Sequence, residues 1–219
     1  MRFRTAILAA LLAAFVCTAC VAEGTMYTWT GGRAFRNCKL SRASYDRGTG
    51  AVVFDAEAPI RPGEDADVGV IETQEIVPPK PFNEAVPSWN SYTPDGAYLM
   101  VSMKARVGGK WTGWYRVVLY TRGNKPEPKK SFTDADSVAG VAVDTLRIKG
   151  GKKADAIKMR LELRSVDGKN YPALRYMTLH TNDPLAWISL KQPVKSVWGT
   201  ELDVPYLCQL SVPGGSVWC

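Results

Sequence analysis

The residues that could take part in covalent chemistry gather at the end of this sequence. Cys219 follows Trp218 and a Gly214-Gly215 turn, and Gln209 lies ten positions before it. A cysteine attacks through its thiolate, which forms readily at a helix N-terminus or beside a histidine. The sequence contains one histidine, His180, so a single imidazole could serve as the base.

The stretch from Leu202 to Cys219 resembles the opening of a papain-like cysteine peptidase domain. The run Val204-Pro205-Tyr206, then Gln209, then Gly214-Gly215-Ser216-Val217-Trp218-Cys219 is similar to exported bacterial peptidases related to the double-glycine-leader (bacteriocin-processing) family. The resemblance implies that Cys219 is the nucleophile, that Gln209 stabilises the oxyanion, and that the substrate of intact relatives is a peptide or protein. Cys208 departs from the family pattern, in which a small hydroxyl residue is expected there.

The partners that such a nucleophile needs are missing from the sequence. The family base is a histidine after the cysteine, oriented by Asp or Asn, whereas His180 precedes Cys219 in a stretch that alternates like a strand. No residue follows Cys219, so no helix begins there, and its own α-carboxylate disfavours a thiolate. We therefore expect Gln209 and Cys219 to be vestigial in a truncated peptidase start, and the polypeptide to have no peptidase activity. An ordinary Pro/Gly-rich tail is the alternative interpretation.

The N-terminus has the pattern of an export signal. Arg2 and Arg4 precede an uncharged apolar run over residues 5–16, which is too short for a stable membrane span. Residues 1–22 are therefore predicted to be a signal peptide. Thr18-Ala19-Cys20 resembles the end of a bacterial lipobox, which implies lipidation of Cys20, although Cys17 stands where that pattern has an aliphatic residue. Ordinary cleavage near Ala19 or Ala22 is the alternative, and either route places the mature protein in the cell envelope or outside the cell.

Cysteine usage beyond this leader does not require a disulfide framework. Cys38, Cys208 and Cys219 are left, which is an odd number. A Cys38–Cys208 bridge is compatible with an exported protein. The favoured interpretation is that Cys38 is a small buried apolar side chain.

The middle of the sequence predicts a β-sandwich. Alternating apolar residues over Ala97–Val107 and Ile157–Leu163, with Gly- and Asp-rich turns between such runs, are typical of half-buried strands. We also expect strands over Lys39–Tyr45 and Trp111–Tyr120. Motifs around Trp89 and Trp111 resemble the jelly-roll-like domain that precedes the peptidase in the same family. The predicted order is a sandwich over 25–183, a linker over 184–200 and a peptidase stub over 201–219.

Three tryptophans are candidates for a ligand platform: Trp89, Trp111 and Trp114. An indole can stack against the apolar face of a sugar ring, although tryptophan is more often packed in a core. Trp111 and Trp114 are three positions apart, so a regular strand would point them to opposite faces, and at most one would belong to a given platform.

Charge and composition restrict the remaining function classes. The net charge of +7 falls to +5 once Arg2 and Arg4 leave with the signal. The lysines are scattered, without the basic stripe of a nucleic-acid-binding protein. We expect no metal and no cofactor, and membrane association through a lipid at Cys20 alone. The main alternative to a peptidase relative is a non-catalytic envelope lipoprotein whose sandwich binds carbohydrate or protein.

Overall fold

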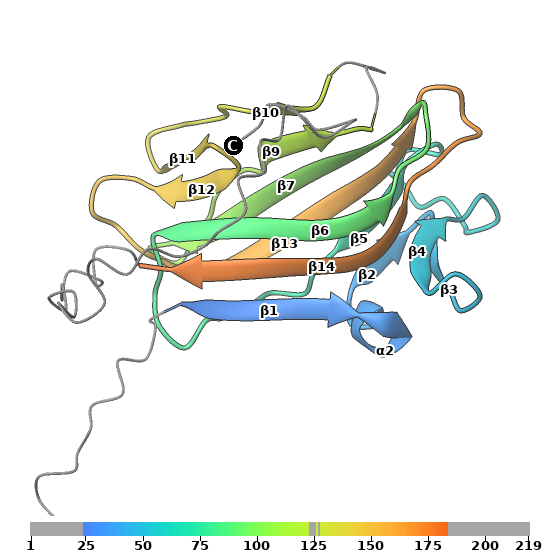
Figure 1. Cartoon of the computed structure of the whole chain (residues 1–219). Helices are drawn as coiled ribbons and strands as arrows, with labels where there is room; N and C mark the ends of the chain where they lie inside the picture. The colour runs from blue at the N-terminus through green and yellow to red at the C-terminus, as the bar shows by residue number, and fades with distance from the viewer. Residues whose placement is uncertain (1–23, 123–125, 127, 184–219) are drawn as a thin grey trace, which may run out of the picture. The chain divides into compact units, whose positions relative to one another are not determined.

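The structure is a computed structural model that describes residues 24–122, 126 and 128–183 (Figure 1). Within this range nearly all regular structure is β, and the helix α2 (Gly31–Phe35) has five residues. The strands in chain order are β1 (Thr25–Thr30), β2 (Lys39–Ser41), β3 (Ala43–Asp46), β4 (Ala51–Phe54), β5 (Gly69–Glu72), β6 (Glu84–Tyr92), β7 (Ala97–Val107), β8 (Lys110–Trp111), β9 (Tyr115–Tyr120), β10 (Lys130–Ser131), β11 (Ala139–Ala142), β12 (Thr145–Ile148), β13 (Ala154–Ser165) and β14 (Ala173–Asn182).

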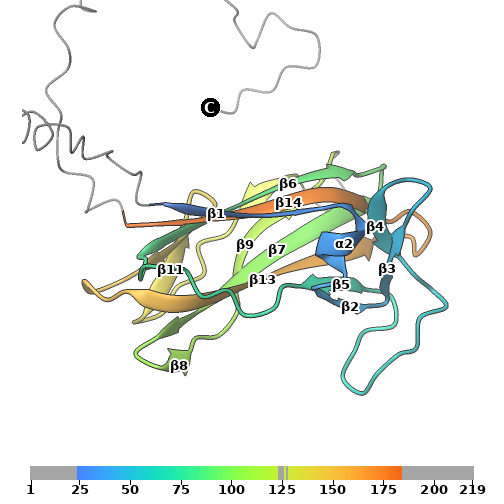
Figure 2. The same ribbon diagram turned by 90° about the horizontal axis from the view of Figure 1, so that it is seen from below.

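These strands form two antiparallel sheets. Sheet A has the order β11-β12-β6-β14-β4-β3, with β1 paired to β14. Sheet B has the order β10-β9-β7-β13-β5-β2, with β8 paired to β7. Figure 2 shows them as two layers, with β6 and β14 in one layer and β13, β5 and β2 in the other. The predicted β-sandwich is confirmed.

The core lies between the layers, because the central strands place most of their apolar side chains on one face. In β7 the side chains of Leu99, Val101, Met103 and Ala105 are fully buried, while Lys104 stays partly exposed on the other face. The neighbouring strand β13 buries Ile157, Met159, Leu161 and Leu163 in the same way. Each strand therefore gives its apolar face to the core and its charged face to the outside of sheet B.

One predicted strand proved wrong, because the chain changes sheets within it. The stretch Lys39–Tyr45 is divided by Arg42, whose φ is +50°. On one side of it Ser41 pairs with Val70 of sheet B, and on the other Ala43 pairs with Phe54 of sheet A. A residue in this left-handed region cannot continue a strand, so β2 and β3 belong to different layers.

Candidate functional site

The structure separates Trp89 from the other two candidate platform residues. Trp89 lies on β6 of sheet A and packs against the core. Its ring meets the ring of Tyr120, on β9 of sheet B, edge-on at a centroid distance of 5.7 Å. Trp89 therefore links the two sheets at one end of the sandwich, which is the packing role that its size favours.

Trp111 and Trp114 share one surface, contrary to the expectation for a regular strand. The predicted strand Trp111–Tyr120 is interrupted: β8 ends at Trp111 and β9 begins at Tyr115. Between them the hydroxyl of Thr112 accepts the N–H of Ala105 at 3.1 Å and donates to the carbonyl of Gly113 at 2.9 Å. The break alters the alternation, and both indoles lie against the ammonium group of a single residue, Lys104.

Four cations lie beside the two indoles on the outer face of sheet B, and one of them, Arg106, has its guanidinium carbon 5.8 Å from the Trp111 centroid. The Nζ atom of Lys104 is 4.7 Å from the Trp114 centroid and 5.4 Å from that of Trp111. The guanidinium carbon of Arg160 is 4.2 Å from the Trp114 centroid, and Lys158 Nζ is 5.9 Å from that of Trp111. Cations are attracted to the faces of aromatic rings at such distances. We use the name tryptophan–cation cluster for Trp111, Trp114, Lys104, Lys158 and Arg160.

Glu72 on β5 is the acidic neighbour of this cluster. Arg160 Nη2 donates to Glu72 Oε2 at 2.6 Å, and Lys158 Nζ lies 3.6 Å from Oε1. Burial by itself would raise the pKa of Glu72. The hydrogen bond from Arg160 and the charges of Arg160, Lys158 and Lys104 together outweigh burial, so the pKa of Glu72 is lowered from its ordinary value of 4.5. Glu72 is therefore an anion at neutral pH.

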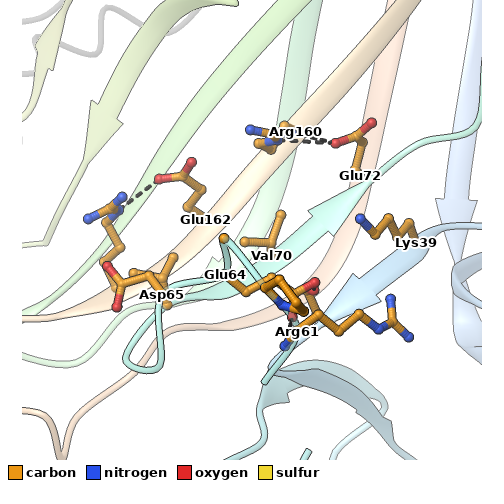
Figure 3. Close-up of a pocket in the computed structure, with 13 residues that line it drawn as sticks. Lys39, Arg61, Glu64, Asp65, Val70, Glu72, Arg160 and Glu162 are labelled. Carbon is orange, nitrogen blue, oxygen red and sulfur yellow. Dashed lines mark hydrogen bonds and ion pairs between the residues drawn. The ribbon is translucent and has the colours of Figure 1, made fainter. Parts of the chain in front are cut away.

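A depression of about 400 Å³ continues this face beyond Glu72 and Arg160. Its floor comes from β13, β5 and β2, and its far wall from the loop residues Arg61–Asp65. Figure 3 shows Arg160 paired with Glu72 on the floor, and Arg61 and Glu64 opposite them. The loop is held down because the Ser41 hydroxyl donates to the Glu64 carboxylate, which also accepts the N–H of Arg61.

Two projections from the sandwich border this outer face. Figure 2 shows β8 on one side of the β13–β5–β2 layer and the long connection between β4 and β5 further along the same layer. The β8 projection carries Trp111, and the β4–β5 connection carries Arg61–Asp65. The face therefore combines aromatic rings, cations and a depression between two raised edges.

The part of the chain that the structure describes contains one cysteine and one histidine. Cys38, its one cysteine, is buried, and desolvation raises the pKa of its thiol to about 12. His180 is a half-exposed residue of β14, as predicted. Among the described residues no three His, Cys, Asp or Glu side chains gather as a metal site would require, and no helix is long and apolar enough to cross a membrane.

The inertness of Cys38 is testable. At a pKa of about 12, roughly one thiol in ten thousand is ionised at pH 8. We expect a short pulse of N-ethylmaleimide, followed by peptide mass mapping, to leave Cys38 unmodified in the native protein and to modify it in denaturant. Labelling of native Cys38 at the rate of free cysteine would contradict this assignment.

The remaining predicted site residues cannot be placed. Gln209, Cys219 and the lipidation candidate Cys20 lie outside the described residues. The same holds for the predicted signal over 1–22, the linker over 184–200 and the peptidase stub over 201–219. Their roles stay predictions.

The described sandwich matches a known protein family. Residues 25–182 match the family model described as the Peptidase C39 N-terminal domain. The chain belongs to this family. No curated protein and no solved structure matches the chain. The match spans the described sandwich, so the outer face of sheet B lies within this Peptidase C39 N-terminal domain.

Sequence reasoning found the two indoles of this Peptidase C39 N-terminal domain but missed the charges beside them. Lys104, Lys158 and Arg160 each occupy a polar position of a strand that was itself predicted. That pattern could have shown that one face of each strand is basic. It could not show that the two strands are neighbours, or that Glu72 lies beside them.

Proposed function

We propose that the sandwich is a non-catalytic binding domain, and that its outer sheet B face binds a glycan chain of the cell envelope. The observation that carries this proposal is the convergence of Trp111, Trp114 and four cations beside a depression on one face. Trp111 is 36% exposed, which is unusual for a side chain that proteins mostly bury. An indole held in this position offers an apolar surface to a sugar ring.

The family assignment gives this binding domain its context. Its description links the domain with peptidases, while the described residues offer no reactive thiolate. We therefore propose that the sandwich brings a peptidase-related protein to its ligand, and that Cys219 and Gln209 are the residues through which the family chemistry would act. Export, with a lipid anchor at Cys20, is part of the same proposal. A protein ligand is the alternative partner for the same face.

The binding role predicts a loss of glycan affinity when the indoles are removed. Trp111→Ala and Trp114→Ala should each lower the affinity for protein-free cell-wall polysaccharide by roughly tenfold, because each substitution removes one aromatic surface. The measurement is a pull-down over a series of polysaccharide concentrations. Tyr92→Ala is the matched control, because Tyr92 is an aromatic residue of β6 in sheet A and is 59% exposed. Equal binding by the wild type and all three variants would overturn the proposal.

A further inference from the structure

Like charges lie next to one another on the outer face of sheet B, and their repulsion lowers the stability of the fold. Lys104 and Lys158 are direct cross-strand partners in the β7–β13 register. Arg160 lies two residues further along β13 on the same face. Like charges directly opposite each other destabilise a sheet. Sheet formation alone therefore does not account for this placement.

Glu72 compensates the cluster only in part. It pairs with Arg160 and approaches Lys158. Lys104 makes no ion pair with any described carboxylate, and its nearest partners are the two indoles. When Arg106 is counted with its partners Glu75 and Asp155, four cations face three carboxylates, which leaves a net local charge of about one positive unit.

The environment of Lys104 makes an added anion favourable. Burial is the main reason that the pKa of Lys104 is lowered, and repulsion from Lys158 and Arg160 adds to it, while Glu72 acts in the opposite direction. An anion beside the ammonium group would relieve that repulsion and replace part of the lost solvation. Arg106, the other nearby cation, is already paired with Glu75 and Asp155.

From this arrangement we infer an anion subsite on the tryptophan–cation cluster, in which Lys104 and Lys158 bind a carboxylate or phosphate group carried by the glycan. The inference rests on the proposed function, because it names the chemical class of the ligand for the same face. Trp111 and Trp114 would contact the sugar ring that carries the charged group. Glu72 would compete with the ligand's anionic group for Lys158 and Arg160 and limit the excess of positive charge.

The test compares three soluble probes by isothermal titration calorimetry: polygalacturonate oligomers for carboxylate, poly(glycerol phosphate) for phosphate, and neutral dextran oligomers. Wild-type protein should bind at least one anionic probe more tightly than dextran. Lys104→Met should lower that affinity about tenfold, since a charge-assisted contact is lost. Lys104→Arg should retain most of it. The preference between the two anionic probes identifies the charged group.

Matched variants distinguish anion binding at a specific subsite from nonspecific electrostatic attraction. Lys110→Met removes one positive charge from the same β8 projection, where Lys110 is exposed, and should leave the affinity within about twofold of wild type. Glu72→Gln should raise the affinity for the anionic probe, because it removes the competing carboxylate. A purely structural role for the cluster predicts a fall instead. Circular dichroism establishes that each variant is folded.

The outcomes distinguish the subsite from the binding function. Equal affinity of wild type and Lys104→Met for every probe, with Trp111→Ala still weakened, would overturn the anion subsite and leave the glycan-binding face intact. Failure of wild-type protein to bind any probe or cell-wall polysaccharide would overturn the binding function itself. An equal loss of affinity in Lys110→Met and Lys104→Met would show unspecific charge attraction and would also overturn the subsite.

Discussion

Replacing Arg42 by alanine is expected to lower the free energy of unfolding by about 3 kcal/mol. The Arg42 side chain is buried, and its guanidinium donates to the carbonyl oxygens of Ala66 at 2.9 Å, Ala56 at 2.5 Å and Ala58 at 2.6 Å. It also lies 5.2 Å from the ring centroid of Phe54. Alanine would leave three carbonyl oxygens without this donor, and each such loss is costly where water has poor access.

The strained backbone conformation of residue 42 does not affect the comparison of wild type with Arg42→Ala. Arginine and alanine both carry a Cβ, so the cost of a φ of +50° is present in both proteins. The check is thermal or urea unfolding, with a decrease in Tm of roughly 6–12 °C expected for a chain of this length. Arg47→Ala is the control, because Arg47 lies exposed in the β3–β4 turn. Unfolding curves that coincide for the two variants would show that the three hydrogen bonds contribute little.

Arg42 also matters for the binding face. The three carbonyl groups that it holds belong to the connection between β4 and β5, which carries Arg61–Asp65 to the edge of the depression. Loss of the guanidinium should therefore loosen that wall before the sandwich unfolds. Faster hydrogen exchange of residues 56–66, at a denaturant concentration where the core is still protected, would show this local opening.

Glu72→Gln is expected to destabilise the protein by about 2 kcal/mol at pH 7. The Glu72 side chain is 14% exposed and its partner Arg160 is 31% exposed, so solvent screens their attraction only partly. Neutral glutamine would leave Lys104, Lys158 and Arg160 facing one another without a countercharge. Glu75→Gln is the matched control: the Glu75 carboxylate, which pairs with Arg106, is 38% exposed, so solvent screens this pair more and the loss of stability should be smaller.

The stability lost in Glu72→Gln has a definite pH dependence. The pKa of Glu72 is lower in the folded protein than its ordinary value of 4.5. A group of this kind contributes its full stabilisation above the unfolded-state pKa, and loses it as the pH falls through the folded-state pKa. Wild type and Glu72→Gln should therefore differ most near pH 7 and become more alike as the pH falls below the ordinary value of 4.5. A difference that is the same at pH 7 and pH 3 would contradict the charge argument.

Much of the fold was accessible from local patterns. The alternation over Ala97–Val107 predicted β7 with its observed bounds, and the run around Met159 predicted the centre of β13. A strand buries every second side chain whatever its neighbour is, so such a pattern can be recognised within about ten residues. His180 was predicted correctly as a strand residue from the same alternation. Cys38 was predicted correctly to be buried because a free cysteine behaves as a small apolar side chain.

Predictions failed where the backbone departs from regular strand geometry. The left-handed conformation of Arg42 divided one predicted strand between two sheets, and the guanidinium of the same residue binds carbonyl groups 14 to 24 residues away. The break after Trp111 placed it on the same face as Trp114, because Thr112 pairs with Ala105 of the neighbouring strand. Both departures depend on long-range contacts, which cannot be inferred from the alternation of apolar residues along one strand.

Local patterns in the sequence were enough to predict strands with one apolar and one polar face, whereas the three candidate tryptophans were interpreted more readily as packed side chains than as a platform. The sequence also carried the family resemblance. The tertiary structure alone decided that Lys104 faces Lys158, and that Glu72 reaches Arg160 across 88 positions of the chain. The physical reason is that cross-strand register is set by how the buried faces of distant strands fit together. The packing of the buried faces therefore also decides which charged side chains meet on the outer face.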